Sequence, residues 1–153
     1  MCSGCQGPEY IPSDGVQFTC QHLYSRRTHE KLPSSSCPNP KSGSEEALGR
    51  VFNALALAAE CKQKGDEVAV VFNGTGTRWP AELTKLSHPA NGLYHSVRDV
   101  VQGASCGCAE VFGATEAVKS CGVPMVKDHA LAGTTGLLSL RRYIAEGWNT
   151  VVF

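Results

Sequence analysis

Two cysteines separated by a single glycine form the group of residues in this chain that is best suited to chemistry. The stretch Ser105-Cys106-Gly107-Cys108 stands where a weak strand ends and a helix begins. A thiol at a helix N-terminus lies near unpaired backbone N–H groups and the positive end of the helix dipole, which favour the thiolate. From residue types and spacing alone, two interpretations stay open. Cys106 and Cys108 are either nucleophilic or sulfur-carrying thiols, or small residues that pack a tight turn.

The cysteines near the N-terminus offer a different chemistry. The chain has eight cysteines and no secretory signal, which does not indicate a disulfide framework. Cys2 and Cys5 have the C-x-x-C spacing of a zinc site or a redox pair, and Cys20 with His22 or Cys37 could supply further zinc ligands. This metal-binding module is an alternative. Our prediction is that the chain holds no metal and no cofactor.

Two loops near the predicted thiol site carry other polar residues. Asn73-Gly-Thr-Gly76 follows a buried strand, but it lacks the complete glycine pattern of a nucleotide-binding loop, so a tight turn is favoured. His129 follows a short strand at residues 123–126 and is a candidate for adjusting the thiolate or binding a donor. The alternative for His129 is an ordinary hydrogen-bonding role in its loop.

These side chains need elements that position them, and such elements are predicted from residue 40 onward. A capping signal at Ser42 and Glu45 begins a long amphipathic helix that closes at residues 64–65. Strands are expected at 67–72, 123–126 and 149–153. Further helices are expected at 81–85, from Leu93 through Val101 to an end near Gly103, at 108–120, and from 137 to a stop at Gly147.

The order of these elements predicts the fold class. Strands and helices alternate without a hairpin signal, which indicates one α/β layered sandwich over residues 40–153, with a mainly parallel sheet of about five strands flanked by helices. Ligands of such sheets bind at the carboxyl ends of the strands, where helix N-termini point. Cys106 and Cys108 fall at that edge.

The first strand of this sheet is doubtful in the sequence. Residues 1–39 lack sustained periodicity and are rich in Ser and Pro, so we predict an irregular or disordered segment. The run Lys31-Leu-Pro-Ser-Ser-Ser-Cys-Pro38 before the first helix is a very poor strand. Read in a neighbouring frame, the same bases could encode a β-branched strand. We hypothesise a frameshifted start, which sequencing the gene against close relatives would test.

Composition excludes several classes of partner. Lys plus Arg equals Asp plus Glu at 14 each and no basic run occurs, which argues against nucleic acid and anionic lipid as partners. The longest apolar stretches fall short of the roughly 20 residues that span a bilayer, and the N-terminus lacks the apolar region of a signal peptide. We therefore expect a cytoplasmic protein with no nucleic-acid or membrane partner.

Three sequence patches resemble a known family. Gly103-Ala-Ser-Cys-Gly-Cys-Ala109, Val118-Lys-Ser-Cys-Gly-Val-Pro124 and Ser139-Leu-Arg-Arg-Tyr-Ile-Ala-Glu-Gly-Trp148, followed by a Thr-Val-Val-Phe strand, are together similar to the DsrE/DsrF-like family, which includes the sulfur-relay Tus proteins. The resemblance implies a small α/β sandwich that assembles into homo-oligomers. It also implies a persulfide on Cys108, which matches the sulfur-carrying position of the family. Cys106 is an extra neighbour that many relatives lack, and its role as a secondary, resolving thiol is our own hypothesis.

The resemblance further implies transpersulfidation, in which Cys108 receives sulfur from a donor and passes it to an acceptor. The expected partners are donor and acceptor proteins or small thiols. The alternative is a non-catalytic, oligomeric ligand-binding or scaffold module of the same fold, because fold alone does not decide activity.

Overall fold

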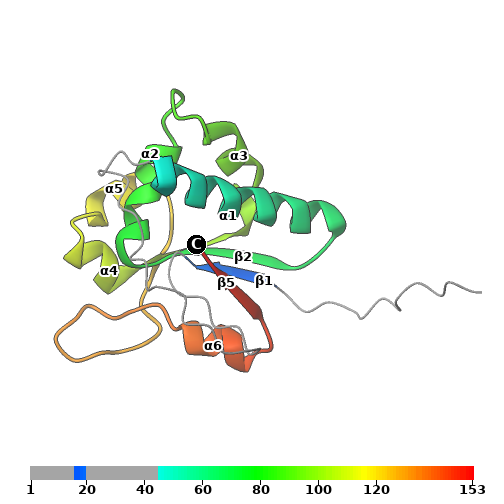
Figure 1. Cartoon of the computed structure of the whole chain (residues 1–153). Coiled ribbons are helices and arrows are strands. Elements are labelled where there is room, and N and C mark those ends of the chain that lie inside the picture. The colour runs from blue at the N-terminus through cyan, green and yellow to red at the C-terminus, as the bar shows by residue number, and fades with distance from the viewer. Residues whose placement is uncertain (1–15, 20–44) are drawn as a thin grey trace, which may run out of the picture.

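The apolar run after the first helix forms a fully buried strand, and helices cover both faces of the sheet around it (Figure 1). The computed structural model describes residues 16–19 and 45–153. The strands are β1 (Val16–Thr19), β2 (Val68–Phe72), β3 (Val101–Ser105), β4 (Met125–Val126) and β5 (Asn149–Val152). The α-helices are α1 (Glu45–Lys64), α2 (Trp79–Leu83), α3 (Asn91–Ser96), α4 (Cys106–Val111), α5 (Thr115–Ser120) and α6 (Leu140–Ala145). Short 3-10 helices are η2 (Gly74–Arg78) and η3 (Arg98–Val100).

The sheet is parallel. Its strands lie in the order β4-β3-β2-β1-β5, and every neighbouring pair is parallel. The predicted α/β class, with a parallel sheet flanked by helices, is therefore confirmed. In a parallel sheet all strands end at the same edge, so the loops after β2 and β3 lie close together.

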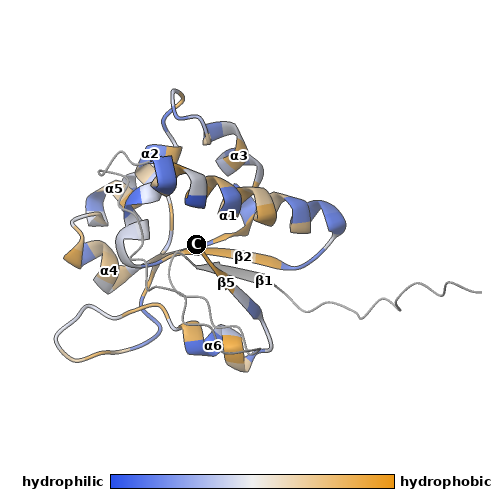
Figure 2. Cartoon of the chain, viewed as in Figure 1, coloured by the Kyte–Doolittle hydropathy of each residue, from blue (hydrophilic) through white to orange (hydrophobic). Residues whose placement is uncertain are grey.

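Strand β2 separates two apolar cores because successive side chains of a strand point to opposite faces. Val68, Val70 and Phe72 enter the larger core, whereas Ala69 and Val71 enter the smaller one. In Figure 1, α1 lies over one face of the sheet and α6 under the other. Figure 2 shows the apolar character of β2 against the mixed surface of α1.

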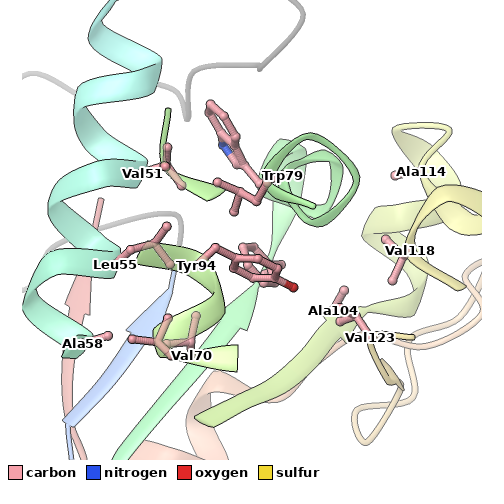
Figure 3. Packing of buried hydrophobic residues seen from close by; sticks show 14 of the residues in the cluster. Val51, Leu55, Ala58, Val70, Trp79, Tyr94, Ala104, Ala114, Val118 and Val123 are labelled. Atoms are coloured by element: carbon pink, nitrogen blue, oxygen red, sulfur yellow. The ribbon is translucent and has the colours of Figure 1, made fainter. Parts of the chain in front are cut away.

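The larger core rests on α1, whose predicted position is confirmed. Its buried residues recur at helical spacing: Ala47, Val51, Leu55 and Ala58. They pack in one cluster with Tyr94 of α3 and with residues of α2, α4 and α5 (Figure 3). Burial of this apolar stripe, together with two acidic residues in the first turn, stabilises the helix.

The helix predicted to end near Gly103 is wrong in its second half. Helix α3 stops at Ser96, and residues 101–105 form strand β3. Gly103 has a φ of +151°, and a Cβ there would lie 2.6 Å from the carbonyl oxygen of Pro124. The small residues of β3 therefore allow the segment that leads to β4 to approach closely. Because few residues of β3 are β-branched, the sequence pattern that predicts a strand is weak there.

The helix predicted over 108–120 is also wrong as a single element. It is divided into α4 and α5, and α4 begins at Cys106 rather than Cys108. Gly113 has a φ of +64°, the left-handed conformation that ends a helix at low cost when the residue is glycine. A new helix then begins at Thr115.

Strand β1 comes from within the segment predicted to be irregular. Val16–Thr19 pairs with β2 on one side and with β5 on the other. In the sequence, the first strand thus lies well before the Ser- and Pro-rich run, and not directly before α1. The remainder of residues 1–39 lies outside the described residues, so the predicted boundary at residue 40 and the frameshift hypothesis stay predictions. Among the helices of the described part, none is long and apolar enough to span a lipid bilayer.

Candidate functional site

Both predicted thiols lie in the first turn of α4, directly after strand β3. Cys106 is the first residue of the helix, Cys108 is the third, and both are half-buried free cysteines. The preceding Ser105 is buried, and its hydroxyl accepts a hydrogen bond from the backbone N–H of Leu138 at 3.2 Å. Ser105 therefore fastens the strand end to the chain before α6.

The Cys108 thiol has a specific partner in the neighbouring loop. Its Sγ donates to Oδ1 of Asn73 across 2.9 Å. Asn73 directly follows β2, and its Oδ1 also accepts the backbone N–H of Gly74 at 3.0 Å, which caps η2. The adjacent ends of β2 and β3 thus bring together two residues 35 positions apart.

Sequence reasoning missed Asn73 as a site residue. It interpreted residues 73–76 as a tight turn, and the structure does form a short 3-10 helix there. The signal that could have identified Asn73 is an asparagine at the end of a strand next to β3. The side-chain oxygen of Asn can cap a helix while its amide group stays available to another residue.

Cys106 and Cys108 do not face one another. Residues two apart in an α-helix are separated by roughly 200° around the axis. A disulfide between these two thiols would therefore require the first turn of α4 to open.

The N-terminal end of α4 is held by a close backbone contact. The N–H of Gly107 donates to the carbonyl oxygen of Gly136 at 2.7 Å. A Cβ at Gly107 would lie 2.9 Å from Leu137 Cδ2 and 3.0 Å from the Gly136 oxygen. Only glycine allows the chain at residues 134–137 to pack this tightly against the helix.

The other end of α4 is held by an arginine. Nε of Arg78 donates to the carbonyl oxygen of Phe112 at 2.9 Å, and its guanidinium lies 5.8 Å from the centre of the Phe112 ring. With contacts at both ends and one at Cys108, the helix that carries the thiols is fixed to η2 and to the loop before α6.

His129 lies at the base of that loop. Its backbone pairs with Leu137 in both directions, at 2.9 Å and 2.8 Å, in an isolated antiparallel bridge. The residue is exposed, and within residues 45–153 no hydrogen bond joins its side chain to Cys106 or Cys108. The described contacts place His129 in a structural bridge, and its action on a thiol stays a prediction.

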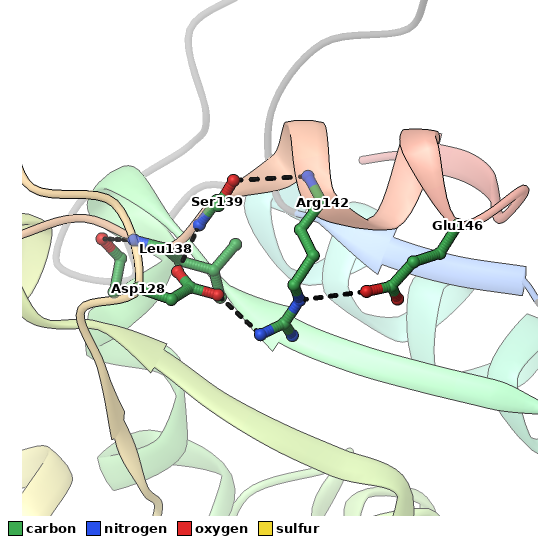
Figure 4. A network of polar contacts seen from close by, with 6 residues as sticks. Asp128, Leu138, Ser139, Arg142 and Glu146 are labelled. Carbon is green, nitrogen blue, oxygen red and sulfur yellow. Dashed lines mark hydrogen bonds and ion pairs between the residues drawn. The ribbon is translucent and has the colours of Figure 1, made fainter.

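Asp128 joins the same loop to α6 (Figure 4). Its carboxylate accepts the backbone N–H of Ser139 at 2.6 Å and forms an ion pair with Arg142 at 2.7 Å. Arg142 also lies 3.8 Å from the carboxylate of Glu146. The beginning of α6 is thereby tied to the segment that packs on Gly107.

An open hollow of about 500 Å³ lies between α4 and this loop. It is lined by Gly107, Glu110, Val111, Gly133, Thr134 and Thr135. Gly107, Glu110 and Val111 share one face of α4 by helical spacing, and the positions of Cys106 and Cys108 flank that face. Val111 is 74% exposed, so the hollow has an apolar rim. A partner seated here would lie next to the thiol-bearing turn.

The remaining described cysteines have structural surroundings. Burial, together with Asp66 and Glu60, raises the pKa of the Cys61 thiol. Cys121 lies 3.6 Å from the hydroxyl of Thr84. Among the described residues, no group of three His, Cys, Asp or Glu side chains could hold a metal ion. The alternative zinc site of the N-terminal cysteines lies outside these residues.

Comparison with known proteins yields one uncharacterized relative. The chain is similar to the uncharacterized protein MJ0733 of Methanocaldococcus jannaschii, with 29% identity over 103 residues that cover 66% of this chain and 78% of the relative. No family model matches the chain. No solved structure matches it either.

Proposed function

We propose that this chain is a cytoplasmic sulfur carrier of the DsrE/DsrF-like type, which holds sulfane sulfur as a persulfide on Cys108. The observation that carries the proposal is the position of Cys108 in a well-anchored first helical turn at the carboxyl edge of a parallel sheet. The thiol is half-buried, and the neighbouring Gly107 in the same helical turn lines a hollow that a partner could enter. The proposal includes the five-stranded sandwich as the working fold and a homo-oligomer as its assembly.

The transfer requires no external oxidant. The Cys108 thiolate attacks the terminal sulfur of a donor persulfide, a new S–S bond forms, the donor S–S bond breaks, and the donor leaves as a thiolate. An acceptor thiolate then attacks the terminal sulfur on Cys108, and Cys108 leaves as the thiolate. Donor and acceptor are proteins or small thiols. Sulfur changes its carrier, and the number of electrons is conserved.

Cys106 offers a second way to discharge the sulfur. Its thiolate would attack Sγ of the Cys108 persulfide, form the Cys106–Cys108 disulfide and release hydrosulfide. Because the two side chains point to different sides of α4, this route needs a local opening of the helix. We therefore assign it a secondary role.

Persulfide loading tests the carrier. The protein is incubated with a cysteine desulfurase and cysteine, or with polysulfide, and its intact mass is measured before and after reduction. We expect the wild type to gain the mass of sulfur and Cys108→Ala to gain none, while the matched variant Cys121→Ala loads like the wild type. An adduct of equal size in Cys108→Ala would reject Cys108 as the carrier.

One observation favours a second candidate, a non-catalytic scaffold module of the same fold. The Cys108 thiol donates its hydrogen to the amide oxygen of Asn73, so it takes part in a contact within the protein that a purely structural role would also explain. The scaffold predicts no sulfur adduct on any cysteine of residues 45–153 in the loading experiment.

A further inference from the structure

The amide oxygen of Asn73 is shared by two hydrogen-bond donors that belong to different parts of the chain. It accepts the backbone N–H of Gly74 at 3.0 Å and the thiol of Cys108 at 2.9 Å. Rotating the amide by half a turn would place its NH₂ group against the Gly74 N–H, so two donors would meet. The cap of η2 therefore fixes which atom of Asn73 faces the sulfur.

This fixed orientation distinguishes the chemical states of Cys108. A neutral thiol has a hydrogen to donate to Oδ1, whereas a thiolate has none and is repelled by the oxygen. In a persulfide, Sγ is bonded to carbon and to the second sulfur, so it carries no hydrogen at any pH. Loading of sulfur must therefore break the hydrogen bond that Sγ of Cys108 donates to Asn73.

We propose that Asn73 is a positioning residue that retains Cys108 while it is an unloaded, neutral thiol and releases it when it carries sulfur. The release part of this inference rests on the proposed function, while the retention part concerns the reduced protein alone. The unloaded thiol is held toward η2, and the loaded sulfur is free to turn toward a partner. Asn73 thus favours reaction of the carrier in its loaded state.

Two substitutions separate the thiol contact from the cap. Asn73→Ser keeps a good N-cap acceptor but is too short to serve the thiol, whereas Asn73→Asp keeps both contacts and adds a negative charge beside the sulfur. Iodoacetamide labelling of Cys108 at one neutral pH, resolved by peptide mass, should be about 2-fold to 10-fold faster in Asn73→Ser, as expected for the loss of one hydrogen bond. It should be slower in Asn73→Asp.

The two substitutions are expected to change the labelling rate of Cys108 in opposite directions, which distinguishes the proposal from general damage to the structure. A loosened loop would speed labelling in both variants, and melting temperatures show whether each protein is folded. Cys106 in the same samples serves as the internal control, because it points away from Cys108 and its labelling rate should not change. An unaltered Cys108 rate in Asn73→Ser, or a faster rate in Asn73→Asp, would overturn the proposal.

A vibrational spectrum supplies an independent readout. The S–H stretching band of Cys108, identified by its absence in Cys108→Ala, should lie at lower frequency in the wild type than in Asn73→Ser, because donation weakens the S–H bond. If the protein shows this frequency shift but takes up no sulfur, Asn73 does retain the thiol and the proposed carrier function is wrong. If the protein loads sulfur but shows neither the frequency shift nor the changes in labelling rate, the proposed function stands and the proposed role of Asn73 is wrong.

Discussion

Gly107 and Cys108 are neighbours in α4, yet different contacts constrain them. Gly107 leaves no room for a side chain, because the chain at Gly136 and Leu137 packs directly against its Cα. Cys108 points to another side of the helix and reaches Asn73. Since α4 has only six residues, its dipole is short. The individual contacts of Cys108 therefore determine the orientation of its thiol.

Substitution of Gly107 tests the packing at this turn. In Gly107→Ala the new methyl group meets a backbone oxygen at 3.0 Å and a leucine methyl at 2.9 Å, so the loop must shift. We expect a loss of about 1–3 kcal/mol in the free energy of unfolding, typical of an overpacked site. Urea denaturation measures it.

Gly49→Ala is the matched control, since Gly49 lies in the second turn of α1 and nothing lies within 4 Å of a Cβ there. Helix propensity alone predicts a gain of about 0.5–1 kcal/mol there. If both substitutions changed stability by the same amount and sign, the packing account of Gly107 would fail.

At the scale of elements, the beginning of α6 depends on a residue outside the helix. Ser139 caps the helix by accepting the N–H of Arg142 at 3.3 Å, and Asp128 accepts the N–H of Ser139 in turn. The ion pair between Asp128 and Arg142 completes the link. Because residues 129–138 lie between Asp128 and this cap, the contact closes the loop that borders the hollow.

Substitutions of Asp128 test the link between the loop and α6. Asp128→Ala removes the acceptor and the ion pair, and we expect a loss of about 1 kcal/mol with faster amide exchange at Ser139. Asp128→Asn keeps an acceptor and should lose less. Glu146→Gln removes only a pair at 3.8 Å between exposed groups and should be nearly neutral. Equal effects in all three variants would contradict the assigned role of Asp128.

The elements differ in how far the sequence predicts them. Helix α1 and strand β2 were predicted because long apolar patterns determine them locally. Strand β3 was predicted only as a weak strand that ends at Ser105, and its first residues were assigned to a helix, since Gly103 is required by a contact with Pro124. The division between α4 and α5 was not predicted, since Gly113 adopts a left-handed turn. For the same reason the pairing of Cys108 with Asn73 was missed: it joins two loops that only the sheet order brings together.

At the scale of the whole molecule, the sheet separates a large core from a small one, and the large core contains a buried tyrosine hydroxyl. Tyr94 is fully buried, and its ring packs edge-on against Phe72 at 6.4 Å between centres. Its hydroxyl has no hydrogen-bond partner among the described residues. A buried, unpaired hydroxyl costs about 1–3 kcal/mol, so this core is less stable than its apolar packing would allow.

Titration of Tyr94 connects this core to the stability of the molecule at high pH. Burial raises the pKa of the Tyr94 hydroxyl, with Arg98 opposing and Cys121 adding to the shift. The folded protein therefore keeps this proton at pH values at which the unfolded chain has lost it. Because the native state then binds more protons, stability is complete below the unfolded pKa of about 10 and falls as pH rises through the higher folded value.

Tyr94→Phe tests both consequences, because it keeps the ring and removes only the hydroxyl. At neutral pH we expect a gain of about 1 kcal/mol, which raises the melting temperature by about 2–4 °C in a chain of this size. Above about pH 10 the advantage should grow, since the variant has no proton to lose at this position. Melting temperatures of both proteins across neutral and alkaline pH measure the two effects. A variant less stable than the wild type at neutral pH would mean that the hydroxyl has a partner, and the core would then owe part of its stability to that bond.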